Sequence, residues 1–129
     1  MLKVTQVTLS LESKSGVLAT VARVLADAGV NITALNAEEA AGRGKLRLLG
    51  DAPAKAIAAL KAAKYRPTEQ TGVTVALDSR PGALAGVAEK LAQAKINIKS
   101  AYATTAAGGP ATLVLSVPNA DKAVQALGR

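Results

Sequence analysis

Residues 78–98 read DSRPGALAGVAEKLAQAKINI, and residues 12–32 read ESKSGVLATVARVLADAGVNI. The two stretches have the same layout, since a shift of 66 positions carries Gly16 onto Gly82 and Asn31 onto Asn97. Self-similarity at a fixed period indicates a repeated structural unit. The sequence therefore predicts two repeats, the first in residues 1–70 and the second in residues 71–129.

Hydrophobic periodicity predicts the same series of elements in both copies. Residues 1–11 alternate between apolar and polar side chains, as a half-buried strand does, and residues 73–77 repeat the pattern. A helix at about 16–28 and its equivalent after Gly82 carry apolar residues at helical spacing. Strands at about 31–40 and 97–105 then enter hairpins through turns at 42–44 and 108–110, and short helices follow Pro53 and Asn119.

Two sides of the main helices have different expected partners. One stripe should pack on the sheet, and a second side of alanines is small enough for close approach by another helix. The stripe consists of Leu18, Val21, Ala22 and Leu25, repeated as Leu84, Val87, Ala88 and Leu91; the alanines are Ala19, Ala26, Ala85 and Ala92.

Each copy therefore reads β-α-β-β-α-β, which is the ferredoxin-like arrangement. We expect an α+β fold in which this unit occurs twice, each time as an antiparallel sheet with two helices on one face. Residues 65–70 are the expected last strand of the first copy, although Pro67 limits that strand to an edge or a bulge. Only Gly128 and Arg129 follow the last helix, so the final strand of the second copy should be missing or very short.

The repeated pattern resembles the ACT domain, whose signature is a strand, D/E-x-R-P-G-x-L, an aliphatic helix and G-I/V-N-I. The resemblance covers nearly the whole chain and implies a small regulatory module that commonly binds amino acids. Ser15 replaces the family's proline in the first copy, and Lys95 replaces its glycine in the second. The matching residues are Glu12, Gly16, Leu18, Gly29, Asn31 and Ile32, then Asp78, Arg80, Pro81, Gly82, Leu84, Asn97 and Ile98.

A candidate ligand site lies at the glycine turn of each copy. The first turn of a helix leaves backbone N–H groups without partners, and the helix dipole favours a carboxylate there. Glycine at positions 16 and 82 would let a ligand approach the backbone. We expect the amides of Asn31 and Asn97 to lie near the same end of the sheet, where they would complete a site for a zwitterionic amino acid.

The resemblance implies that the ligand sits at the interface between two ACT units, touching this turn and this asparagine. The same residues also have purely structural explanations: the turn itself requires glycine, Ser13 and Ser79 are suitable helix caps, and the asparagines can bond to backbone. The expected ligand-binding residues are Leu11, Glu12, Ser13, Ser15, Gly16, Val17, Leu18, Asn31, Ile32, Leu77, Asp78, Ser79, Pro81, Gly82, Ala83, Leu84, Asn97 and Ile98.

The composition argues against catalysis. The chain has no cysteine and no histidine, so it offers no thiolate nucleophile and lacks the usual zinc ligands. No pair of carboxylates gathers at one predicted site to act as acid and base. We therefore expect a non-enzymatic protein with no catalytic residue, metal or cofactor.

The formal net charge of +7 suggests nucleic-acid binding, but its distribution does not. The excess is spread over both copies, and Tyr65 and Tyr102 are the only aromatic residues available for stacking on bases. The densest basic cluster, Arg43, Lys45 and Arg47, suits an anionic partner as well as a solvated sheet edge. No nucleic-acid partner is predicted.

Two functions follow from the resemblance. The first is an amino-acid sensor whose occupancy is passed on allosterically through assembly. The alternative is a regulatory subunit that modulates a partner amino-acid biosynthetic enzyme through protein contact, which an exposed apolar patch would favour. The alanine-lined helices predict a homodimer. With no secretory leader and no long apolar run in the sequence, we expect a cytoplasmic protein without membrane contact.

Overall fold

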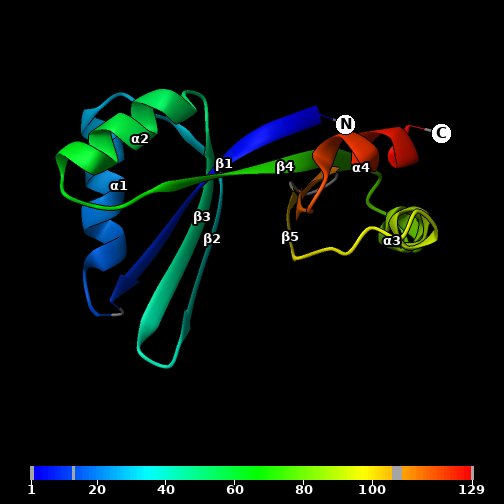
Figure 1. Cartoon of the computed structure of the whole chain (residues 1–129), viewed down its shortest axis with the longest axis horizontal. Helices are drawn as coiled ribbons and strands as arrows, with labels where there is room; N and C mark the ends of the chain where they lie inside the picture. Colours follow the sequence, from blue (N-terminus) through cyan, green and yellow to red (C-terminus); the bar gives the residue numbers. More distant parts are fainter. Residues whose placement is uncertain (1, 13, 106–108, 129) are drawn as a thin grey trace. The chain divides into compact units, whose positions relative to one another are not determined.

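A computed structural model describes residues 2–12, 14–105 and 109–128 of the 129-residue chain. These residues form strands and helices in the predicted order (Figure 1). Their bounds are β1 Leu2–Glu12, α1 Val17–Asp27, β2 Ile32–Ala40, β3 Arg43–Gly50, α2 Pro53–Ala62, β4 Thr68–Leu77, α3 Ala83–Gln93, β5 Ser100–Thr105, β6 Ala111–Ser116 and α4 Ala120–Leu127.

The chain groups into two compact units. We call Thr5–Gln70 the Gly16 unit, and Met1–Val4 together with Thr71–Arg129 the Gly82 unit. The Gly16 unit has strand order β2-β3-β1 followed by the first residues of β4, and helices α1 and α2 (Figure 1). The Gly82 unit has the order β1 start-β4-β6-β5, with helices α3 and α4. The predicted ferredoxin-like α+β unit, repeated twice, is confirmed.

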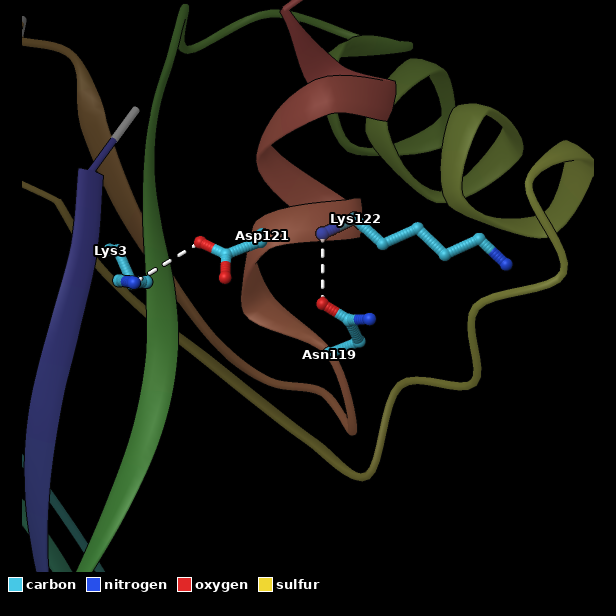
Figure 2. Close-up of polar contacts among 4 residues, drawn as sticks. All are labelled: Lys3, Asn119, Asp121 and Lys122. Carbon is cyan, nitrogen blue, oxygen red and sulfur yellow. Dashed lines mark hydrogen bonds and ion pairs between the residues drawn. The ribbon is translucent and has the colours of Figure 1, made fainter.

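The first residues of the chain belong to the Gly82 unit, together with the C-terminal half of the chain. No strand follows α4 in the described part of the chain, as predicted. In the Gly82 unit the first residues of β1 lie next to β4, and the Lys3 ammonium contacts the Asp121 carboxylate at 3.1 Å (Figure 2). The place of the missing last strand is thus taken by the beginning of β1.

Strand β4 also contributes to both units. The sequence predicted separate strands on either side of residue 70, but Thr68–Leu77 is one continuous strand. It begins only after Pro67, because proline has no N–H for a sheet ladder. In the Gly16 unit the Thr68 hydroxyl is hydrogen-bonded to that of Thr8 in β1.

The β2–β3 hairpin is tighter than predicted. Ala41 and Gly42 form its turn with φ of 52° and 78°, the two positive values of a type I′ connection. Arg43 and Gly44 therefore belong to β3 and not to the turn at 42–44 that the sequence suggested. In the second copy, residue 108 of the predicted turn lies outside the described residues, and Gly109 and Pro110 precede β6.

Each unit has its own core between sheet and helices. Val21 and Leu25 of α1 are buried as expected, but Leu18 and Leu84 are 48% and 56% exposed, so the prediction that they pack on the sheet is wrong. Both lie in the first helical turn, where side chains point back toward the helix start and away from the packed part of the sheet. The cores are Val7, Leu9, Val21, Leu25, Val30, Leu46, Leu48, Ala56 and Leu60, and Val73, Val75, Leu91, Ile96, Leu113, Leu115, Val117, Ala120, Ala123 and Leu127.

Candidate functional site

The two glycine turns have the same backbone geometry. Gly16 and Gly82 have φ of 84° and 88° and form the N-caps of α1 and α3. This left-handed conformation favours glycine. A Cβ built at either residue would meet no atom within 4 Å, so there is also open space above each turn. The turn therefore requires its glycine and at the same time leaves room beside it.

The residues around the Gly82 turn are held locally. The Arg80 amide donates to the Asp78 carbonyl at 2.9 Å, and the Arg80 guanidinium lies 3.6 Å from the Asp78 carboxylate. Because Gly82 is the N-cap of α3, Ser79 does not cap this helix. Ser13, its counterpart in the first copy, lies outside the described residues.

Within one unit the asparagine lies far from the turn, contrary to our expectation. Glu12 at the end of β1 and Ala40 at the end of β2 both pair with Arg43, whereas Ile32 at the start of β2 pairs with Gly50. Eight strand steps of about 3.3 Å separate Ile32 from Ala40, roughly 25 Å in all. A crossover helix makes β1 and β2 parallel, so β2 starts at the end of the sheet opposite the turn.

Asn31 is fixed through its backbone at that far end. Its N–H donates to Oδ1 of Asp51 at 3.0 Å, and its carbonyl accepts from the Asp51 N–H at 3.1 Å. The side chain is exposed, as is that of Asn97.

Register gives the same separation in the Gly82 unit. Leu77 pairs with Ala111 at one end of the sheet, whereas Ser100 pairs with Ser116 at the other, and Asn97 precedes Ser100. The expected site residues thus divide into turn groups and far-end groups. Leu11, Glu12, Ser15, Gly16, Val17 and Leu18 lie at one turn and Leu77, Asp78, Ser79, Pro81, Gly82, Ala83 and Leu84 at the other, while Asn31 with Ile32 and Asn97 with Ile98 lie at the far ends.

A cleft of about 230 Å³ opens beside the Gly16 turn. It lies between the end of β1, the start of α1 and the β2–β3 hairpin. Four of its residues, Leu11, Glu12, Val17 and Leu18, were expected at the site. The remaining residues come from the loop before α1 and from the hairpin, which the sequence analysis did not include: Lys14, Ala37, Glu38, Glu39, Gly44, Lys45 and Leu46.

The floor of the cleft continues the core. Leu46 pairs with Leu9 and with Ala37, and this row faces the helices. The next row on the same face consists of Leu11, Gly44 and Glu39. Gly44 has no side chain, so the row is hollow at its centre. Val17 and Leu18 of α1 close one side, which gives an apolar floor with a carboxylate at its edge.

The charged residues of the cleft differ in their hydrogen-bond and ion-pair partners. Oε1 of Glu39 accepts a hydrogen bond from the Gly42 N–H at 3.1 Å. Oε1 of Glu38 is 3.2 Å from Nη1 of Arg47, and strand alternation places both on the opposite face of the sheet. The Lys14 carbonyl accepts a hydrogen bond from the Val17 N–H at 3.4 Å, but the Lys14 ammonium has no hydrogen-bond or ion-pair partner in the part of the chain that the structure describes.

The described residues form neither a candidate metal centre nor a membrane-spanning helix. Residues 2–12, 14–105 and 109–128 contain no group of three or more His, Cys, Asp or Glu side chains that could hold a metal ion. In the same ranges, every helix is too short or too polar to cross a bilayer.

Comparison with known proteins shows where this fold recurs. A family model described as ACT domain pair matches residues 2–127. A solved structure from Bacteroides thetaiotaomicron is 32% identical, with 98% of this chain and 87% of that chain covered and a TM-score of 0.91. The comparison with curated protein sequences gave no match.

Two more distant structures share the fold. The regulatory subunit of aspartate kinase from Thermus thermophilus, in its ligand-free form, has a TM-score of 0.69 at 18% identity, covering 96% of this chain and 90% of that one. The regulatory subunit of aspartate kinase from Thermus flavus has a TM-score of 0.68 at 17% identity with the same coverage. Because the family model spans nearly the whole chain and the two units repeat one fold, the chain belongs to the ACT domain family, as an ACT domain pair.

Proposed function

We propose that this chain is a non-enzymatic regulatory protein that binds an amino acid beside its Gly16 turn and passes on occupancy through assembly. The observation that carries the proposal is the cleft at that turn, which has an apolar floor beside charged groups. The floor would contact the side chain of an amino acid, and the charged groups would pair with its ammonium and carboxylate. The absence of histidine and cysteine from the sequence supports a role without catalysis.

The comparisons support regulation at the level of the fold. The two Thermus proteins are regulatory subunits of aspartate kinase, and one of them was crystallised in a ligand-free form. Membership of the ACT family adds amino-acid binding as the expected activity.

A ligand that touches both a glycine turn and an asparagine would need two modules. In one unit, Gly16 and Asn31 lie at opposite ends of the sheet, which is too far apart for one amino acid to bridge. A ligand in the cleft at the Gly16 turn therefore does not contact Asn31 of the same unit, and the proposed site does not include that asparagine.

A thermal-shift screen of the full chain against the twenty amino acids tests the proposed function. A ligand that binds only the folded state stabilises it by about 2.7 kcal/mol at a concentration one hundred times its Kd. We expect one amino acid, or a chemically related group, to raise the unfolding midpoint by several degrees. If none of the twenty raises it, the chain is not an amino-acid sensor.

A second candidate function is control of an amino-acid biosynthetic enzyme through direct contact. Leu18 and Leu84 occupy equivalent places in the two units, and both are large exposed apolar side chains. The test is co-elution of the chain with a separately supplied aspartate kinase catalytic domain on gel filtration. Contact through these leucines predicts a complex that Leu84→Glu weakens, and two separate peaks for the native chain would contradict it.

We also propose a homodimer. Ala19, Ala26, Ala85 and Ala92 lie on exposed sides of α1 and α3, where small side chains permit close helix packing. Light scattering on the eluting protein should give twice the mass of one chain. The mass of a single chain at micromolar concentration would contradict a dimer.

A further inference from the structure

The surroundings of the two glycine turns differ at one row of the sheet. In the Gly16 unit this row is Leu11, Gly44 and Glu39. In the Gly82 unit the corresponding row is Leu77, Ala111 and Thr105. The repeat thus replaces a glycine by an alanine and a glutamate by a threonine.

The glycine in the first row makes a hollow. A Cβ at Gly44 would lie 3.7 Å from the Leu11 carbonyl and 3.9 Å from the Glu38 carbonyl, which are ordinary contacts. The backbone there would accept a side chain, so the space above Gly44 is available to a ligand. Ala111 carries a methyl group at this place and is only 8% exposed.

We infer that the chain binds one amino acid with an aliphatic side chain at the Gly16 turn, and none at the Gly82 turn. This inference rests on the proposed function and names its ligand class and stoichiometry. The ligand side chain lies over Leu11, Ala37 and Leu46. Its ammonium group pairs with Glu39, and its carboxylate faces Lys14 and the first turn of α1.

The size and polarity of the cleft select the ligand class. A cleft of about 230 Å³ has room for the side chain of valine, leucine or isoleucine. A polar side chain would lose water over Leu46 and Ala37 without gaining a hydrogen bond. Every amino acid carries the same ammonium and carboxylate groups, so the apolar contact of the side chain should decide which amino acid binds.

The charge on Glu39 explains why one turn should bind and the other should not. A ligand ammonium leaving water needs an anionic partner. Glu39 can serve, because its Oε1 is already positioned by the Gly42 N–H. The aligned position in the Gly82 unit is threonine, which offers no carboxylate in the sequence.

Isothermal titration calorimetry of the full chain with leucine, isoleucine, valine, serine, aspartate and lysine tests the inference. We expect heat of binding from at least one of the three aliphatic amino acids, at one ligand per chain. Serine, aspartate and lysine should bind at least ten-fold more weakly than that aliphatic amino acid. Two ligands per chain, or tighter binding of serine, aspartate or lysine, would overturn the inference and leave the proposed function standing. No binding by any of the three aliphatic amino acids would overturn the inference, and the absence of a thermal shift with all twenty amino acids would overturn the proposed function as well.

Two pairs of matched variants locate the site. Ala37 pairs with Leu46, Ala103 pairs with Leu113 at the same place in the other hairpin, and both alanines are exposed. Ala37→Leu should fill the cleft and weaken binding by ten-fold or more, whereas Ala103→Leu should leave it unchanged. Equal effects of the two would overturn the assignment to the Gly16 turn.

The second pair tests the carboxylate. Glu39→Gln should weaken binding by ten-fold or more, whereas Glu89→Gln, which makes the same charge change on the exposed side of α3, should not. Unchanged binding in Glu39→Gln would overturn the role of Glu39. Circular dichroism of each variant confirms that it is folded before titration.

Discussion

Lys3 in β1 donates a hydrogen bond from Nζ to Oδ1 of Asp121 in α4 at 3.1 Å, although 118 positions separate the two residues (Figure 2). Both belong to the Gly82 unit, so this unit is complete only when the start of the chain takes part in it. The second copy therefore depends on residues that its own repeat does not contain.

Deleting residues 1–4 should destabilise the Gly82 unit. The deletion removes the β1 residues that lie beside β4, and each backbone hydrogen bond lost there costs about 1 kcal/mol, so the unfolding free energy should fall by more than about 1 kcal/mol. Urea unfolding followed by circular dichroism measures the change. Lys3→Ala is the control, because its exposed ion pair with Asp121 contributes at most about 1 kcal/mol. An unchanged midpoint in the deletion variant would contradict the shared-strand arrangement.

Leu18 and Leu25 should respond differently to truncation although both lie on the apolar stripe of α1. Leu25 is fully buried, so Leu25→Ala should cost about 2–5 kcal/mol of unfolding free energy. Leu18 is 48% exposed, and Leu18→Ala should cost less than about 1 kcal/mol. Because Leu18 lines the cleft, its truncation should instead weaken ligand binding. Equal losses of stability would show that Leu18 is buried in solution.

Adding one methyl group should have opposite effects at two glycines of the Gly82 unit. A Cβ at Gly82 or Gly86 would meet no atom within 4 Å, so neither change creates a clash. Gly82 has φ of 88°, and Gly82→Ala should destabilise by about 1 kcal/mol. Gly86 lies inside α3, where alanine is favoured, so Gly86→Ala should stabilise by about 0.5–1 kcal/mol. Chemical denaturation measures both, and a loss at both positions would contradict the backbone geometry.

Helices α1, α2 and α3 are each followed by a residue with positive φ, namely Gly29, Lys64 and Lys95. Only the first of these residues is glycine. Lys95 has φ of 60°, and Lys95→Gly should raise the unfolding free energy by up to about 1 kcal/mol. Gly29→Ala is the reverse control and should lower it. A lower midpoint for Lys95→Gly would show that this lysine has a stabilising contact in solution. The three motifs are Gly29 with the Val30 amide bonded to Leu25, Lys64 with Tyr65 bonded to Leu60, and Lys95 with Ile96 bonded to Leu91.

The repeat and the two hydrophobic periods were sufficient to predict the order of elements. Apolar alternation locates Val7 and Leu9 on one face of β1, and helical spacing locates Val21 and Leu25 on one side of α1; all four are buried. Local pattern carries this information because each side chain's direction follows from its own secondary structure. Local pattern does not tell how far a sheet extends beneath a helix, and for this reason Leu18 was misplaced.

The composition of the site depends on the sheet topology, which brings together residues that are far apart in the sequence. The expectation that Asn31 lies near Gly16 overlooked the parallel crossover, which sends the start of β2 to the opposite end of the sheet. The same topology brings the β2–β3 hairpin, with Ala37, Glu39 and Gly44, to the end where β1 meets α1. The predicted β-α-β-β order already implied that β1 and β2 are parallel. That strand direction could have located these hairpin residues beside the glycine turn.

The segment that replaces the missing last strand of the second copy also comes from a distant part of the chain. The short tail after α4 predicted correctly that no strand follows it. That Leu2–Val4 of β1 would fill the place could not be read from either copy alone, because the strand comes from the opposite end of the chain.

The most direct test of the account is an amide NMR map of the full chain titrated with leucine, isoleucine or valine. The account predicts that the shift changes fall in residues 11–18 and 37–46, which surround the Gly16 turn, and that residues 78–84 at the Gly82 turn are unchanged. Changes confined to the Gly82 turn, or an unchanged spectrum at saturating concentrations of all three amino acids, would contradict it.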